Sequence, residues 1–209
     1  MSQAATDTRQ KLIDTAGRLI WMNSYGAVSV DDICKAADVK KGSFYHFFPS
    51  KADLAMAALD HEEAVLRPVY DMIFSASRPP VERLTMLADL IVEKQADMLR
   101  EVGHVCGCPS GSLGCELAGT DSIIKDKIDQ IFTFKKRYYE STIRDLVTEG
   151  QLPQDTDCKA RADEILDYIT GQMLVARVQN SLDHLERNLK SGLLRLLGLK
   201  DPGSAADAA

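Results

Sequence analysis

Apolar residues recur at intervals of three and four along almost all of this 209-residue chain. No segment shows the polar–apolar alternation that is typical of a half-buried strand. The first periodic stretch, residues 7–23, shows the pattern in five apolar positions on one face: Leu12, Ile13, Ala16, Leu19 and Ile20. This spacing is typical of amphipathic helices that bury a stripe against one another. The sequence therefore predicts an all-α fold.

Capping and breaking residues divide this pattern into separate helices. Ser29 with Asp32, and Ser50 with Asp53, have the spacing of a capping box. Pro49 and Gly150 are typical helix ends. We expect helices at 7–23, 30–37, 41–48, 50–77, 81–101, 121–150, 157–179 and 182–198, the last two capped by Thr156 and Ser181. The stretch 103–119 is irregular, with a helix starting just after Pro109.

Composition limits the environment and size of the protein. At 45% apolar and 27% charged, the chain can bury one large core and a small satellite domain. No apolar run approaches the roughly 20 residues that span a bilayer, and the first residues lack the pattern of a signal peptide. We therefore expect a cytoplasmic location without membrane contact. The five cysteines lack a framework spacing, which favours free thiols.

The net charge of −6 is unevenly distributed. Residues 1–58 carry seven basic and six acidic side chains, whereas the rest carries 18 basic and 25 acidic ones. Any binding to a polyanion must therefore come from a local basic patch. Non-specific architectural DNA binding would need a strongly basic chain, so the charge argues against that class.

Residues 29–48 have the pattern of a helix-turn-helix, two short helices joined by a tight turn. Ser29 caps the first helix, whose N-terminus can meet a phosphate, and residues 38–40 form the turn. In the second helix Phe44 and Phe48 can pack inward. The expected contacts with DNA are Ser29, Lys40, Lys41, Gly42, Ser43, Tyr45, His46 and Lys51. Gly42 is informative because glycine this early in a short helix costs about 1 kcal/mol, and packing does not explain it.

The run from Val30 to Leu54 resembles the N-terminal domain of the TetR family of bacterial regulators, and the resemblance extends over residues 8–59. It implies that Gly42, Tyr45, Phe48 and Lys51 contact DNA or frame the recognition helix. A position that is frequently His in the family is Phe47 here. The resemblance predicts a three-helix DNA-binding domain at 1–50 and a helical ligand-binding and dimerisation domain at 51–199. The small, polar composition at the end of the chain predicts a disordered tail at 200–209.

The resemblance also implies a small-molecule inducer, whose identity the sequence does not give, and a homodimer formed by the last two helices. Apolar stripes in these helices agree with such an interface, although an intramolecular core explains part of the pattern. The stripes consist of Ile165, Tyr168, Ile169, Met173 and Val175, then Leu182, Leu185, Leu189, Leu193, Leu194 and Leu197. Residues 107–118 resemble a Gly-Cys-Pro-x-Gly-x-Leu-x-x-Glu-Leu-Ala element of one branch of the family.

Three interpretations of Cys106, Cys108 and Cys115 remain open: inert packing, a thiol sensor of electrophiles or oxidants, and a metal site with His104. The family resemblance predicts a regulator and not an enzyme. The rival class is a cysteine-dependent enzyme that uses Cys108 and His104, although no hydrolase, phosphate-loop or zinc-protease motif is present. No cofactor is expected. The leading hypothesis is a repressor that a small-molecule or thiol-reactive inducer releases from a palindromic operator.

Overall fold

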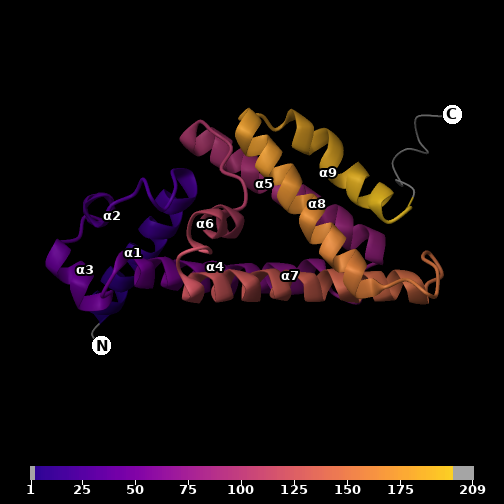
Figure 1. Ribbon diagram of the computed structural model, residues 1–209, viewed down its shortest axis with the longest axis horizontal. Helices are drawn as coiled ribbons and strands as arrows, with labels where there is room; N and C mark the ends of the chain where they lie inside the picture. Colours follow the sequence, from indigo (N-terminus) through magenta and orange to yellow (C-terminus); the bar gives the residue numbers. More distant parts are fainter. Residues whose placement is uncertain (1–2, 200–209) are drawn as a thin grey trace. The chain divides into compact units, whose positions relative to one another are not determined.

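The computed structural model describes residues 3–199, and within them the protein is all-α (Figure 1). Its elements are α1 (Gln3–Met22), α2 (Val30–Ala37), α3 (Lys41–Phe47), α4 (Lys51–Ile73), α5 (Pro80–Val102), α6 (Pro109–Leu117), α7 (Ser122–Thr148), α8 (Cys158–Gln179) and α9 (Asp183–Leu196). The predicted fold class is confirmed. The tail predicted at 200–209 lies outside the described residues.

Local sequence explains where most helices begin and end. Ser29 and Asp32 form the expected capping box at α2, and the Asp53 amide donates to Ser50 Oγ at α4. The prediction of Thr156 as the cap of α8 was wrong. Asp157 caps this helix by accepting from the amides of Lys159 and Ala160, because a carboxylate one residue nearer reaches both orphan donors.

Two compact units divide the chain, and α4 and α7 each run through both. The first unit contains Met1–Pro68 and Cys108–Ile131. Its helix-turn-helix core is built from α1 to α4, with Leu12, Ile33, Phe44 and Leu54 fully buried. Residues 108–131 belong to this unit although they are distant from its N-terminal part in sequence.

The second unit contains Val69–Gly107 and Phe132–Ala209. In it α9 packs against both α8 and α5. Tyr168 on α8 donates from its hydroxyl to the Asn188 carbonyl at 2.8 Å, and Gly192 gives the ring its space, because a Cβ there would overlap the hydroxyl. No helix among the described residues is long and apolar enough to cross a membrane.

The leucine stripe of α9 belongs to the core of its own chain. Leu185 and Leu189 have no exposed surface, and Leu193 and Leu194 are 1% exposed. Their apolar spacing therefore does not support an interface with a partner, and the intramolecular explanation of that pattern is correct. The exposed apolar side chains of the last two helices instead lie on α8, at Leu174, Val175 and Val178.

Candidate DNA-binding interface and sensing loop

The second helix of the helix-turn-helix, α3, is held by two phenylalanines. Phe44 is fully buried and Phe48 is 3% exposed, and their ring centroids lie 6.2 Å apart. The chain enters α3 through Asp38, whose φ of 51° ends α2 in a left-handed conformation. With its inner face fixed in the core, α3 presents its other side chains outward.

Most of the predicted DNA contacts lie on the outer side of α3. Lys40, Lys41, Gly42, Tyr45 and His46 are exposed and Ser43 is half-buried; we call these six residues the α3 face. A Cβ added to Gly42 would meet no atom within 4 Å, so the chain's own packing does not require glycine there. The absence of a side chain at Gly42 leaves room for another molecule to approach the backbone.

Two carboxylates of the chain, Asp31 and Asp32, lie at the N-terminus of α2. Asp32 Oδ2 accepts from the Ser29 amide at 2.9 Å and from the Ser29 hydroxyl at 2.6 Å. The hydrogen bonds from Ser29 lower the pKa of Asp32, so this carboxylate stays charged at the positive end of the helix. Asp31 pairs with Lys41 at 2.8 Å, and both side chains are exposed. A phosphate at this end must therefore compete with carboxylates.

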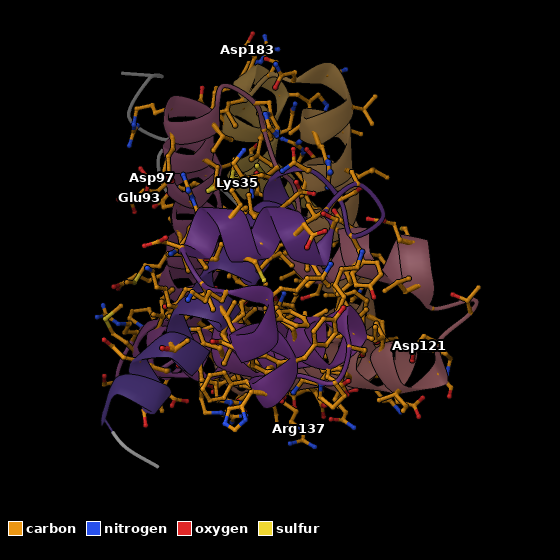
Figure 2. All side chains as sticks on the ribbon, turned by 90° about the vertical axis from the view of Figure 1, so that its left-hand side faces the viewer. Lys35, Glu93, Asp97, Asp121, Arg137 and Asp183 are labelled. Atoms are coloured by element: carbon orange, nitrogen blue, oxygen red, sulfur yellow. The ribbon has the colours of Figure 1, made fainter. Side chains whose placement is uncertain are left out.

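Lys51, predicted to be a phosphate contact, is engaged inside the chain. Its Nζ donates to the carbonyls of Tyr25 and Val28, both at 2.8 Å, and lies 3.9 Å from the centroid of the Tyr25 ring. Burial lowers the pKa of Lys51, and the Glu116 charge opposes that shift. The Lys51 ammonium thus fixes the loop between α1 and α2 by binding two of its carbonyls. Lys35, labelled in Figure 2, is by contrast exposed on α2.

Glu116 on α6 holds the same loop from its other side, and sequence reasoning missed this role. Its two carboxylate oxygens accept from the amides of Tyr25 and Gly26 at 3.0 and 2.8 Å. The loop therefore lies between an anion on its N–H groups and the Lys51 cation on its carbonyls. These contacts join α6 to the helix-turn-helix within the first unit.

The segment that precedes α6 is fixed by Gln95, which is 1% exposed on α5. Its side-chain amide bonds both peptide groups of Gly107: Gly107 N donates to Oε1 at 2.9 Å, and Nε2 donates to the Gly107 carbonyl at 3.1 Å. Gly107 has a φ of 73°, which explains the need for glycine. The Val105 amide donates to Asn180 Oδ1 at 2.9 Å. This stretch is ordered by specific hydrogen bonds.

The three cysteines proposed as sensors have different surroundings. Cys106 has no exposed surface, and burial raises its pKa, which disfavours the reactive thiolate. Cys108 is 9% exposed and its Sγ accepts from the Gly111 amide at 3.3 Å, as the N-cap of α6. Cys115 is exposed on α6, next to Glu116. The described residues contain no group of three His, Cys, Asp or Glu side chains that could hold a metal, so His104 and these thiols do not form the alternative site.

Several aromatic residues that could line a ligand pocket pack against one another in the second unit. Tyr70 and Phe74 of α4 lie 5.3–5.8 Å, centroid to centroid, from rings of α7, and the Tyr70 and Tyr139 hydroxyls are 3.3 Å apart. The rings of α7 that take part in this cluster are Phe134, Tyr138 and Tyr139. Since each ring fills space beside the next, this cluster is core.

An exposed helix on a capped helix-turn-helix, followed by a helical body, defines a class of DNA-binding regulators. Residues 12–58 match the family described as "Bacterial regulatory proteins, tetR family", and residues 80–191 match "Tetracyclin repressor-like, C-terminal domain". The chain therefore belongs to the TetR family of transcriptional regulators, which bind DNA operators, dimerise through the C-terminal domain and are not enzymes.

Similar proteins include transcriptional regulators and solved structures. The transcriptional regulator AcuR of Cereibacter sphaeroides is 29% identical, covering 87% of this chain and 81% of AcuR. The repressor DhaR of a Mycobacterium species is 26% identical, covering 89% and 90%. A crystal structure of the regulatory protein TetR from Rhodobacter sphaeroides has a TM-score of 0.80 and 28% identity, covering 90% of this chain and 97% of the other.

Proposed function

We propose that this regulator is a cytoplasmic repressor that binds a palindromic operator as a two-fold dimer and leaves it when an inducer binds. The observation that carries the proposal is the α3 face, an exposed surface with open space around Gly42. Lys40 and Lys41 supply phosphate contacts, Ser43, Tyr45 and His46 reach base edges, and Ser29 orients α2 at the backbone. Lys51 acts by positioning the loop at 25–28.

The exposed side of α8 supports dimerisation through the last two helices. Leu174 is 57% and Val178 is 78% exposed, and one turn earlier Gly171 leaves open space. The positions Gly171, Leu174 and Val178 follow the spacing of one helical face. A second copy that packs here would remove these apolar groups from water and allow close helix approach.

Two structural features, α4 and the Glu116 contact of α6, support control of the DNA-binding helices by the rest of the chain. The helix α4 is continuous from the first unit into the second, so a shift at its far end can move α3 as a lever. The Glu116 contact gives α6 a direct hold on the loop before α2. Differential affinity of the inducer for two arrangements is sufficient for release. An inducer-bound structure with the same spacing between the two α3 helices as the DNA-bound form would refute this mechanism.

Cys115 is the thiol best placed for a thiol-reactive inducer. It is exposed and precedes Glu116, whose carboxylate holds the α1–α2 loop. An adduct at Cys115 adds bulk beside this contact and weakens it. The buried Cys106 and Cys108 have no such access.

Electrophoretic mobility shift on the DNA that flanks the protein's own gene tests the DNA-binding proposal. Specific binding should require two half-sites about 34–36 Å apart, or a multiple of that distance. Lys40→Ala and Lys41→Ala should weaken binding to all sequences and reduce the slope of log affinity against log salt. Tyr45→Ala and His46→Ala should instead reduce the preference for the operator. An unchanged salt slope after both lysine substitutions would contradict the assigned phosphate contacts.

A further inference from the structure

The first turn of α6 lacks the acceptors that usually satisfy a helix start. Pro109 occupies the first position and has no N–H. The N-cap is Cys108, whose sulfur accepts from the Gly111 amide at 3.3 Å, and sulfur is a weaker acceptor than oxygen. No acidic residue lies in this turn. The positive end of the helix is therefore left without an anion.

Ser110, the second residue of this turn, is 1% exposed, and its Oγ has no hydrogen-bond partner. Within residues 3–199 its amide N–H has no acceptor either. Buried polar groups of proteins are paired with few exceptions. A buried hydroxyl and a buried amide in one residue, both unpaired, thus indicate an acceptor that is not part of the chain.

The Ser110 side chain faces inward and toward the start of the helix. Ser110 lies one turn before Gly114, and an ideal Cβ built on Gly114 would lie 3.4 Å from Ile128 Cδ1 of α7. Ser110 shares this inner side of α6 with the buried Leu113. Helical Cβ atoms tilt toward the N-terminus, the direction in which the free amides also point. The hydroxyl, the Ser110 amide and the Gly111 amide therefore converge on the same end of α6.

We propose that the first turn of α6 binds the carboxylate of a small organic acid. One carboxylate oxygen accepts from the Ser110 hydroxyl and the Ser110 amide, and the other takes the Gly111 amide that now reaches only sulfur. This carboxylate site deepens the proposed function. Only the effect of the bound acid on DNA binding rests on that proposed function. Glu116 lies in the last turn of the same short helix, so an acid bound at the start of α6 can move the loop that Glu116 contacts.

The test is a titration of the full-length 15N-labelled protein with sodium acetate, propionate and butyrate at constant ionic strength, followed by amide NMR. The amides of Ser110 and Gly111 should move downfield and saturate, because a charged acceptor deshields the proton that it binds. Sodium chloride and butyramide serve as controls for ionic strength and for an uncharged ligand of similar shape. If none of the acids shifts these two amides at millimolar concentration, the proposal is wrong.

Ser110→Ala and the matched Ser112→Ala, two positions along the same helix, separate this site from general effects. The loss of a hydrogen bond to a charged group should weaken butyrate binding about tenfold or more for Ser110→Ala, and not for Ser112→Ala. Without acid, Ser110→Ala should keep or raise the melting temperature, since it removes an unpaired buried hydroxyl. Equal weakening in both variants, or a clear fall in melting temperature for Ser110→Ala alone, would overturn the assignment.

A mobility-shift assay with the same acids distinguishes failure of this site from failure of the proposed regulation. Saturating amide shifts without release of DNA would support the carboxylate site and contradict its role as the inducer site. Release of DNA by butyrate without shifts at Ser110 and Gly111 would contradict the carboxylate site and leave ligand-responsive repression intact.

Discussion

At the scale of single residues, the contacts that matter most join positions far apart in sequence. Glu116 accepts a hydrogen bond from the Gly26 amide, 90 residues away in sequence, and no local pattern predicts that pair. Lys51 follows a motif that favours a phosphate contact, yet its ammonium bonds two carbonyls. The sequence predicts which residue types gather at the helix-turn-helix. Partner choice within the loop depends on three-dimensional proximity, which spacing along the chain does not encode.

Cys115 should react first when the protein is treated with a limiting amount of maleimide. It is the exposed thiol, whereas Cys34, Cys106 and Cys108 are buried and Cys158 is half-buried. Burial also raises the pKa of Cys34 and of Cys106, which reduces their thiolate fraction. Mass spectrometry of the peptides gives the order of modification. A faster adduct at Cys106 would contradict the assignment of Cys115 as the accessible thiol.

At the scale of helices, starts and stops could be predicted better than partners. The capping box of α2 follows from Ser29 and Asp32 alone, because a cap is a contact across three residues. The apolar stripe of α9 correctly predicts burial at Leu185 and Leu189, but a stripe does not say which surface covers it. Here α5 and α8 of the same chain cover it. Spacing along the sequence did not predict that Leu174 and Val178 stay exposed while other apolar residues of α8 are buried.

Gln95→Met should loosen the segment before α6. The substitution keeps the volume but removes both hydrogen bonds between the Gln95 side chain and Gly107. Removal of one partner of a buried hydrogen bond costs about 1–3 kcal/mol, so the free energy of unfolding should fall by roughly 2–4 kcal/mol. Urea denaturation measures it, with Gln130→Met, an exposed position of α7, as the control. Equal stability of the two variants would show that Gln95 does not hold this segment.

Acid should destabilise the contact between α4 and α7 in the first unit. The hydrogen bond from Lys127 Nζ, 2.9 Å from Glu63 Oε2, lowers the pKa of Glu63 despite its partial burial. The folded pKa lies below the unfolded value of about 4.3, so this stabilisation is complete above that pH and is lost as pH falls through the folded pKa. Glu63→Gln should therefore flatten the acid side of a stability–pH curve. The exposed Glu149→Gln should leave that curve unchanged.

At the scale of the whole molecule, dimerisation should depend on the exposed side of α8. Leu174→Glu with Val178→Glu places two charges where a partner would bury apolar surface, so the protein should become monomeric and lose most of its operator affinity. Sedimentation velocity measures the mass. Val65→Glu, at a residue 55% exposed on α4, is the matched control and should remain dimeric. A dimer in the double variant would place the interface elsewhere.

The discontinuous first unit has a consequence for synthesis on the ribosome. The helix-turn-helix helices leave the exit tunnel early, but residues 108–131, which belong to their compact unit, follow much later. Until Glu116 has emerged, the loop between α1 and α2 lacks the carboxylate that accepts from the amides of Tyr25 and Gly26. A nascent chain therefore exposes an unfinished DNA-binding unit while the middle of the protein is being made. Completion of that unit is delayed until residues 108–131 have been made, when more than half of the polypeptide already exists.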